Sequence, residues 1–283
     1  MTLLLDGKVA AEALRLKILS QTPKHTACLA ILLVGDDPRS RPYVNNKLKT
    51  AKLWGIDCKH IHLPRSATFA DIQSAILKLN EDKKVNGIIF QLPPDLENPL
   101  SAMETHQLLE SISPAKDADG LLSYNLGALV ALGDKAGTPI PATPLGILRL
   151  LEHYKIPIEG ADICVLGKSR LVGMPVSILL EHRGATVTMC HSGTKDVVEK
   201  AKKADIISAA TGVRGLVKET HVHSKSVLVD VGICATPDGL RGDVDRSVYS
   251  KVGAYSPVPG GAGPMTVAAL MENVITLWKA QQV

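Results

Sequence analysis

Aromatic residues and long apolar runs are scarce in this sequence. Trp, Tyr and Phe number two, five and two among 283 residues, so the hydrophobic cores must consist mainly of aliphatic side chains. No stretch of about 18 apolar residues occurs that would form a transmembrane helix. Asp6 and Glu12 interrupt the amino terminus, which is unlike a secretory signal peptide. We therefore expect a protein that is neither secreted nor inserted in a membrane.

A strong charge of either sign is also missing. The 32 basic and 28 acidic residues give a formal net charge of +4, and no basic stretch is interleaved with aromatic residues, so nucleic-acid binding is not expected. The five cysteines include no CxxC pair, which suits reduced thiols in the cytoplasm. The histidine pairs His60/His62 and His221/His223 have no third ligand nearby, so no metal site is predicted. These absences favour a soluble cytoplasmic enzyme or binding protein.

Short apolar runs alternate with helix-like patterns over most of the chain. A first series predicts strands over 28–34, 59–63 and 87–92 and helices over 42–53, 69–79 and 102–109. A second series predicts strands over 162–166, 186–190, 205–209 and 227–231, with helices over 172–183 and 194–203. Such alternation is typical of α/β proteins with parallel sheets, and the length favours two domains.

The domain boundary is expected in the segment 132–144, which contains two glycines and three prolines. We therefore predict a first domain over 1–140 and a second over 141–264. A last helix, expected over 265–279, would pack with the remaining carboxyl-terminal residues back on the first domain.

The segment 256–266 contains three prolines and three glycines in eleven residues. Glycine permits positive φ and proline fixes φ, so this segment specifies a particular loop path. Thr266 is expected at a helix entrance, where backbone amides without helical partners can face a ligand. The alternative is a rigid connector between two elements.

A glycine-containing turn follows the predicted strand 162–166. The turn begins Gly167-Lys168-Ser169 and reaches Gly173, so it matches the dinucleotide fingerprint GxGxxG only in part, with Ser169 in place of the middle glycine. Its position between a strand and a helix favours a nucleotide site over a plain turn.

The end of the next strand discriminates between cofactors. His191 and Ser192 follow it, and no carboxylate occurs before Asp196. A carboxylate at this place usually binds the ribose hydroxyl of NAD and would repel the extra phosphate of NADP. The sequence therefore predicts NADP, with Lys168 and Arg170 as nearby cations; the alternative is that both are solvated loop charges.

Four polar residues of the first domain form a candidate catalytic group. Tyr43 and Lys47 are four positions apart and would share a helix face. Gln91 ends a predicted strand, and Asp119 lies in a polar turn after a helix, at the kind of sheet edge where α/β sites form. Such a group suits a polar heterocycle, although an isolated Tyr–Lys pair is more often an ordinary surface pair.

Together these segments resemble the bifunctional methylenetetrahydrofolate dehydrogenase/cyclohydrolase family in order and over almost the whole length. The matching segments are 34–38 (VGDDP), Ser40 with Tyr43-Val44 and Lys47, 87–93 (GIIFQLP), 116–120 (KDADG), 143–146 (TPLG), 167–169 (GKS) with Val172-Gly173 and Pro175, 185–188 (ATVT) with His191-Ser192, 229–232 (VDVG), 242–244 (GDV) and 257–266 (PVPGGAGPMT).

The resemblance implies oxidation of 5,10-methylenetetrahydrofolate by NADP+ and hydrolysis of the product to 10-formyltetrahydrofolate in one-carbon metabolism. It implies a Rossmann-like second domain, a cleft between the domains and a homodimer. The implied catalytic residues are Lys47, Tyr43, Gln91 and Asp119, and Leu92, Pro259 and Gly260 would join Tyr43, Lys47, Gln91 and Asp119 in binding the substrate. The implied cofactor-binding residues are Thr143, Gly167, Lys168, Ser169, Val172, Gly173, His191, Ser192, Thr211, Gly212, Gly232, Ile233 and Thr266.

The chain departs from the family pattern at four positions. Ala142 stands in place of a usual Cys, Met174 and Ala128 in place of Arg, and Pro42 is unusual beside Tyr43. Met174 bears on the affinity for the cofactor, but none of these changes removes a proposed catalytic group. The alternatives are a two-domain NADP-dependent dehydrogenase of a small acid or amino acid, and a non-catalytic nucleotide sensor.

Overall fold

The computed structural model describes residues 2–38, 40–237 and 239–282, which form two compact units. The first unit comprises the chain up to Leu16, Leu132–Asp134 and Thr143–Ala269. The second unit comprises Lys17–Ala131, Lys135–Ala142 and the chain from Leu270. The prediction of α/β structure with parallel strands is confirmed in both units.

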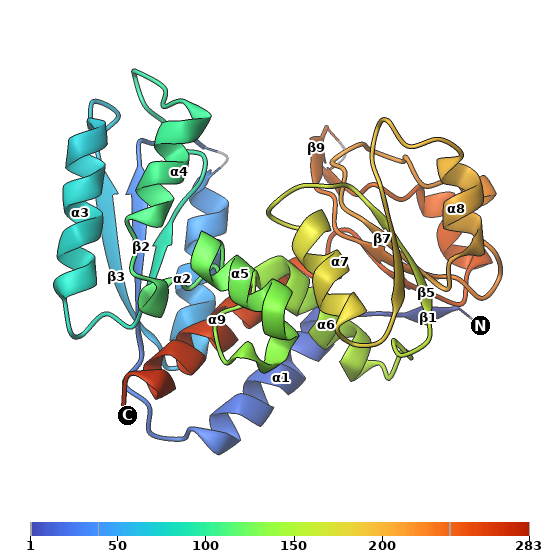
Figure 1. Ribbon diagram of the computed structural model, residues 1–283, viewed down its shortest axis with the longest axis horizontal. Coiled ribbons are helices and arrows are strands. Elements are labelled where there is room, and N and C mark those ends of the chain that lie inside the picture. The colour runs from blue at the N-terminus through green and yellow to red at the C-terminus, as the bar shows by residue number, and fades with distance from the viewer. Residues whose placement is uncertain (1, 39, 238, 283) are drawn as a thin grey trace. The chain divides into compact units, whose positions relative to one another are not determined.

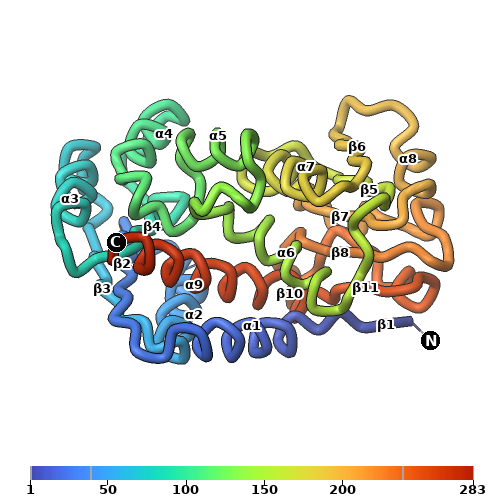
Figure 2. The backbone as a smooth tube through the Cα atoms, turned by 60° about the horizontal axis from the view of Figure 1, so that its bottom comes forward, coloured from blue at the N-terminus to red at the C-terminus, as the bar shows by residue number. Residues whose placement is uncertain are grey.

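The second unit is built on a three-stranded parallel sheet in the order β3-β2-β4 (Figure 1). The strands are β2 (Cys28–Val34), β3 (Asp57–Leu63) and β4 (Gly87–Phe90), and the helices are α2 (Ser40–Leu53), α3 (Phe69–Glu81), α4 (Ala102–Glu110) and α5 (Ser123–Leu132). Helices α3 and α4 cover one face of the sheet, and α2 lies on the other (Figures 1 and 2).

Aliphatic side chains fill the core under α3 and α4. Alternate residues of β2, including Leu32, pack with Ile72 and Ile76 of α3 and with Leu108 of α4. Helix α3 begins with a capping box, because Thr68 and Asp71 each accept a hydrogen bond from the other's backbone amide. The core and the cap together fix the helices on the sheet.

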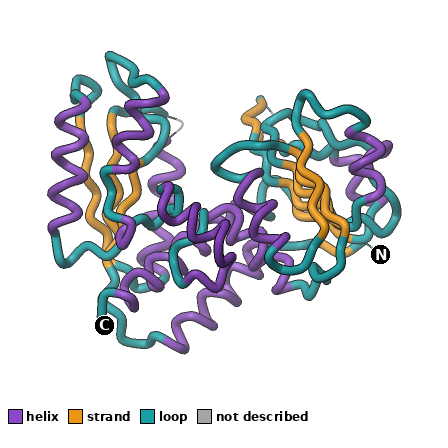
Figure 3. The backbone as a smooth tube through the Cα atoms, in the orientation of Figure 1, coloured by secondary structure: helices purple, strands orange, loops and turns teal. Residues whose placement is uncertain are grey.

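The first unit contains a six-stranded, wholly parallel sheet in the order β1-β11-β8-β7-β5-β6. Its strands are β1 (Leu3–Leu4), β5 (Asp162–Leu166), β6 (Thr186–Cys190), β7 (Ile206–Ala209), β8 (Val227–Asp230) and β11 (Ala254–Ser256). The helices are α6 (Ala142–His153), α7 (Gly173–Glu181) and α8 (Val197–Lys203), and β9 (Cys234–Thr236) pairs with β10 (Gly239–Arg241) as an antiparallel hairpin. Figure 3 shows these strands gathered between helices, with α7 and α8 on opposite faces.

Two helices contribute more than one residue to each of the two units. They are α1 (Gly7–Gln21) and α9 (Ala262–Ala280). Helix α9 begins three residues before the predicted 265, so Thr266 lies inside the helix and its hydroxyl donates to the Ala262 carbonyl at 3.1 Å. The expectation that Thr266 marks the entrance of this helix is therefore wrong. Within the described ranges, no helix is long and apolar enough to cross a membrane.

Candidate active site and nucleotide site

The structure brings Lys47 and Gln91 together at the carboxyl edge of the three-stranded sheet. Lys47 lies on α2, and its Nζ donates to Gln91 Oε1 at 3.1 Å. The carboxamide of Gln91 is oriented by its own Nε2, which donates to the Leu92 carbonyl at 2.9 Å, and the side chain is almost fully buried. Tyr43, one helical turn before Lys47, is 50% exposed. The site therefore presents a fixed acceptor, an amine and an accessible ring.

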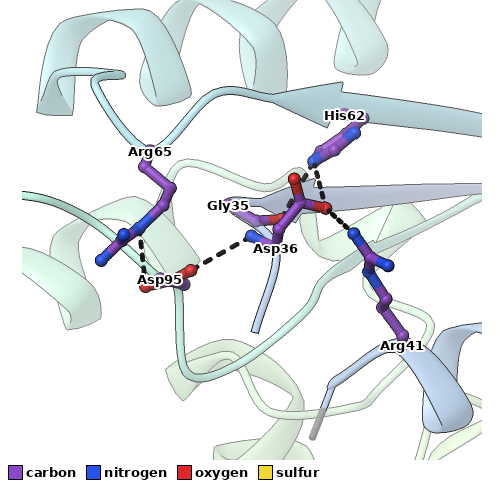
Figure 4. Close-up of polar contacts among 6 residues, drawn as sticks. All are labelled: Gly35, Asp36, Arg41, His62, Arg65 and Asp95. Atoms are coloured by element: carbon purple, nitrogen blue, oxygen red, sulfur yellow. Dashed lines mark hydrogen bonds and ion pairs between the residues drawn. The ribbon is translucent and has the colours of Figure 1, made fainter. Parts of the chain in front are cut away.

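The loop before α2 is held by a network of charged residues (Figure 4). Asp95 accepts from the Asp36 amide at 3.1 Å and from Arg65 Nε at 3.1 Å. Arg41 donates to Asp36 at 2.8 Å, and this contact lowers the pKa of the Asp36 carboxyl. His62 Nε2 lies 2.9 Å from the Gly35 carbonyl oxygen. The network fixes the amino-terminal entry of the helix that carries Tyr43 and Lys47.

The two aspartates of the turn 116–120 have different environments. Asp117 is buried and accepts from the amides of Gly120 and Leu122 and from Asn125 Nδ2, at 3.0, 2.9 and 2.9 Å. Burial raises the pKa of Asp117 to about 6. Asp119 is half-buried, and none of the described residues donates a hydrogen bond to its carboxylate. Asp117 therefore shapes the turn, while Asp119 remains available to a ligand.

The backbone places Asp119 at the same sheet edge as Gln91. Asp117 bridges Ile88 in parallel register, so the chain from 117 to 119 runs beside β4 toward its carboxyl end. Asn273 of α9 supports this path, because its Nδ2 donates to the carbonyls of Ala118 and Ile140 at 2.9 and 2.8 Å. The sequence analysis missed Asn273, because only the packing of distant segments reveals its role.

In the first unit, Gly167 and Gly173 form the predicted turn between β5 and α7. A Cβ on Gly167 would lie 2.4 Å from the Ala210 carbonyl oxygen, and one on Gly173 would lie 2.0 Å from the Gly167 carbonyl oxygen. Ser169 Oγ accepts from the amides of Val172 and Gly173 at 3.1 and 3.4 Å. A hydroxyl that accepts two bonds still has its proton to donate. The turn therefore offers the Ser169 hydroxyl and the exposed Lys168 to an anion.

The side chains that follow β6 are exposed. His191 and Ser192 both face solvent, and Asp196 comes later, at the start of α8. His191 Nδ1 accepts from the Gly193 amide at 3.1 Å. This bond leaves Nε2 of His191 to carry the proton of the neutral ring and to donate to an acceptor.

Four further predicted cofactor residues lie on the loops after β7 and β8. The amides of Thr211 and Gly212 both donate to Asp243 Oδ2, at 2.5 and 3.1 Å, so they are not free to bind phosphate. Gly232 is buried, whereas Ile233 is 43% exposed. Any contact of Thr211 or Gly212 with a cofactor must therefore use other atoms than these two amide protons.

Two distant threonines predicted at the cofactor site lie together. Thr266 Oγ1 of α9 and Thr143 Oγ1 of α6 lie 3.2 Å apart, within hydrogen-bond distance. The close approach is possible because Gly146 has no side chain, and a Cβ there would lie 2.8 Å from the Met265 backbone. Pro259 and Gly260 belong to the first unit, whereas Tyr43, Lys47, Gln91 and Asp119 belong to the second. The predicted substrate residues are therefore divided between the two units.

The residues of the first unit fit a nicotinamide nucleotide. Gly167 and Gly173 leave a cradle that side chains would fill, and Ser169, Lys168 and His191 offer donors and positive charge around it. Phosphate groups bind such glycine turns at the start of a helix. No group of three or more metal-ligating side chains occurs in the part of the chain that the structure describes.

Two family models match the chain. One describes the catalytic domain of tetrahydrofolate dehydrogenase/cyclohydrolase and matches residues 5–119. The other describes the NAD(P)-binding domain of the same family and matches residues 141–282. A bifunctional protein FolD from Aquifex aeolicus is 42% identical, and the alignment covers 99% of this chain and 96% of the relative.

Solved structures agree with these matches. The structure of the bifunctional FolD methylenetetrahydrofolate dehydrogenase/cyclohydrolase from Campylobacter jejuni has a TM-score of 0.91 at 36% identity and covers 99% of both chains. The methylenetetrahydrofolate dehydrogenase-cyclohydrolase from Trypanosoma brucei, crystallised with NADP and an inhibitor, has a TM-score of 0.88 at 30% identity, covering 99% of this chain and 98% of the other.

Proposed function

Because this chain belongs to the tetrahydrofolate dehydrogenase/cyclohydrolase family, we propose that it oxidises 5,10-methylenetetrahydrofolate and hydrolyses the product to 10-formyltetrahydrofolate. The observation that carries the proposal is the hydrogen bond from Lys47 to the buried, oriented Gln91 at the carboxyl edge of the sheet. A dehydrogenase of a small acid or amino acid would give no role to this pair or to Tyr43 and Asp119.

Lys47 is the group to which we assign proton transfer in the hydrolytic step. Water adds to the carbon that bridges the two nitrogens of the methenyl product, and one proton is released. The bond from this carbon to one nitrogen then breaks, and that nitrogen receives the hydroxyl proton. An amine within reach can accept the first proton and relay the second. One N–H of Lys47 donates to Gln91, and this hydrogen bond fixes the directions of the other positions around Nζ.

Tyr43 and Asp119 are assigned to substrate binding. The half-exposed ring of Tyr43 offers an aromatic face to a planar part of the folate. The carboxylate of Asp119 has no donor within the described residues and would accept hydrogen bonds from the amino-bearing edge of the pterin. Together they would orient the substrate relative to Lys47.

We assign the cofactor as NADP, which accepts the hydride when it is bound. The residues that would hold it are the glycines of the 167–173 turn, with Lys168, Ser169, His191 and Ser192. The Trypanosoma brucei relative was crystallised with NADP, which supports the assignment. The dehydrogenase step requires chiefly that the two reacting rings be aligned, so positioning is the main contribution of these residues.

The proposed activity is tested by following absorbance of methenyltetrahydrofolate and of NADPH in one assay. Both signals should rise only when NADP+ and methylenetetrahydrofolate are present together. Supplied methenyltetrahydrofolate should decay faster than its uncatalysed rate. If neither reaction occurs with folded protein at saturating substrates, the proposed function is wrong.

We further propose that the chain forms a homodimer through its nucleotide-binding unit. Strand β6 is an edge of the six-stranded sheet, and Thr186, Thr188 and Met189 on it are exposed. An exposed edge strand is a surface that a second copy can cover. Light scattering should give twice the chain mass of 30.1 kDa, and a monomer at assay concentrations would contradict the proposal.

A further inference from the structure

Two carboxylates with no part in the chemistry above are completely buried in the first unit. Asp230 ends β8, and Asp243 follows β10; both have 0% exposure. The carboxylate of Asp230 lies against Gly242, which precedes Asp243, and the carboxylate of Asp243 lies against Gly232, two residues after Asp230. A Cβ on Gly242 would lie 1.8 Å from Asp230 Oδ2, and a Cβ on Gly232 would lie 1.9 Å from Asp243 Oδ1. The two glycines therefore allow the two carboxylates to pack reciprocally.

The hydrogen bonds of this pair form a chain from the sheet to the turn after β7. Asp230 accepts from the amides of Asp243 and Val244, at 2.8 and 3.1 Å. Asp243 Oδ2 accepts from the amides of Thr211 and Gly212 and from the Thr211 hydroxyl, at 2.5, 3.1 and 2.8 Å. The end of β8 thus holds the segment 242–244, and this segment holds the turn.

Burying these two carboxylates costs free energy that apolar side chains at the same positions would not cost. Asp243 Oδ1 is buried and has no hydrogen-bond partner in the described parts of the chain. Burial, with Asp243 nearby, raises the pKa of Asp230 to about 7, and burial beside Asp230 raises the pKa of Tyr249 to about 12. Unpaired buried polar atoms are uncommon in native proteins, so each calls for an explanation. The turn after β7 offers an explanation. Its three donors, the amides of Thr211 and Gly212 and the Thr211 hydroxyl, are satisfied only by an acceptor at the position of Asp243.

The Thr211–Gly212 turn, which Asp243 holds, lies directly behind the Gly167 turn between β5 and α7. The Ala210 carbonyl oxygen is 2.4 Å from the position that a Cβ of Gly167 would take, and the Ala210 amide donates to the Leu166 carbonyl at 2.8 Å. A shift of residues 210–212 toward Gly167 would therefore displace the turn that receives the cofactor.

We propose that Asp243, supported by Asp230, is a positioning residue that clamps the Thr211–Gly212 turn and thereby keeps the Gly167 turn in the shape that binds the nicotinamide nucleotide. This inference rests on the proposed function only in that the first unit binds such a nucleotide. Asp243 itself need not touch the cofactor, because its carboxylate is directed inward at the backbone of the turn.

The clamp is tested by titrating NADP+ into the purified full-length protein and its variants by calorimetry. Asp243→Ala removes the acceptor of all three donors, and we expect the Kd for NADP+ to rise by about tenfold or more. Asp243→Asn keeps one oxygen for these donors and should restore the Kd to within about threefold of the wild type. Asp245→Asn changes an exposed carboxylate two residues further on and should leave the Kd unchanged.

Two further readouts separate positioning from a general loss of structure. At saturating NADP+, the kcat for dehydrogenation should recover in Asp243→Ala, while the KM for NADP+ stays raised. Hydrolysis of supplied methenyltetrahydrofolate needs no NADP+, and Lys47, its proposed proton-transfer group, lies in the second unit, so this activity should stay within about twofold of the wild type. If Asp243→Ala does not fold, Thr211→Val removes one of the three bonds and should raise the Kd by about two- to fivefold.

A wild-type Kd in Asp243→Ala would overturn the proposal, and so would an Asp243→Asn variant as weak as Asp243→Ala. Where Asp243→Ala cannot be purified, a wild-type Kd in Thr211→Val would overturn it. Failure of the wild-type protein itself to bind either NADP+ or NAD+ would instead contradict nucleotide binding by the first unit.

Discussion

Lys47 differs from the other lysines of α2 because it has an acceptor of fixed orientation. Lys49 and Lys52 on the same helix are exposed, whereas Lys47 is half-buried and bonded to Gln91. The oxygen of Gln91 faces Lys47 because its nitrogen is engaged by the Leu92 carbonyl. An amine held in this way has a defined direction for proton transfer, which a solvated lysine lacks.

Replacement of Lys47 by Met should separate the two activities. Lys47→Met keeps the chain length and the helix propensity but removes the amine. We expect cyclohydrolase activity to fall by about 10²- to 10⁴-fold, the usual loss for a general acid or base, while dehydrogenation falls less. Decay of supplied methenyltetrahydrofolate and formation of NADPH are measured side by side. Lys49→Met is the matched control, and wild-type hydrolysis by Lys47→Met would show that Lys47 has no catalytic role.

Ser192 should determine the choice between the two nicotinamide cofactors. Ser192→Asp places a carboxylate after β6, where it would repel the 2′-phosphate of NADP and could bind the ribose hydroxyl of NAD. We expect the ratio of kcat/KM for NADP+ over NAD+ to exceed one in the wild type and to fall by about tenfold or more in the variant. Ser192→Ala serves as the control without charge. Equal efficiency of the wild type with both cofactors would contradict the assignment of NADP.

At the scale of elements, strands with a clear local pattern were predictable, and elements defined by distant partners were not. The predictions for β2, β5 and β6 are confirmed to the residue, because each is a short run of mainly apolar or β-branched residues between turn signals. Strand β1 has only two residues and exists through its pairing with β11. Helix α9 starts earlier than predicted because Gly263 and Pro264 read as loop residues, although proline is tolerated in a first helical turn.

The same distinction holds for the candidate site. The helical spacing of Tyr43 and Lys47 and the position of Gln91 after a strand follow from local pattern alone. By contrast, the roles of Asn273 and Asp243 depend on which backbone groups the fold brings to them. Asp243 lies in a segment that matches the family, but no periodicity in the sequence indicates which groups Asp243 or Asn273 would contact, so only the structure shows their roles.

Asn273 should couple helix α9 to the turn that carries Asp119. Asn273→Ala leaves the carbonyls of Ala118 and Ile140 buried without their donor, which should lower the free energy of unfolding by about 2–4 kcal/mol. The looser turn should also raise the KM for the folate substrate. Urea denaturation and steady-state kinetics measure the two effects, with Lys279→Ala on an exposed part of α9 as the control. An unchanged midpoint in Asn273→Ala would exclude this coupling.

At the scale of the whole molecule, exposed hydrogen-bonded carboxyl groups and buried carboxyl groups change the free energy of unfolding in opposite directions as the pH changes. Surface carboxyls bonded to donors, such as Asp71 and Glu104 in their capping boxes, have lowered pKa values and lose their contribution as the pH falls. Asp117 and Asp230 have raised pKa values because of burial, so they favour the folded state most at low pH. A stability profile of the wild type alone mixes both effects, whereas a difference between variants isolates one group.

Comparison of the wild type with Asp117→Asn should isolate the contribution of one buried carboxyl. The pKa of Asp117 is about 6 in the folded protein against an ordinary 3.8, so the folded state binds more protons than the unfolded state between these values. The free energy of unfolding of the wild type, relative to the variant, should therefore fall as the pH rises from about 4 to about 7. The change is at most about 3 kcal/mol.

Tryptophan fluorescence in urea is the suitable probe for this comparison, because Trp54 and Trp278, the two tryptophans of the chain, belong to the same unit as Asp117. Loss of hydrogen bonds to the turn should make Asp117→Asn less stable overall, and its deficit should be largest near pH 4 and shrink toward neutrality. A deficit that stayed constant with pH would mean that Asp117 titrates normally. A deficit that grew with pH would mean that the bonds from Gly120, Leu122 and Asn125 outweigh burial and lower the pKa of Asp117.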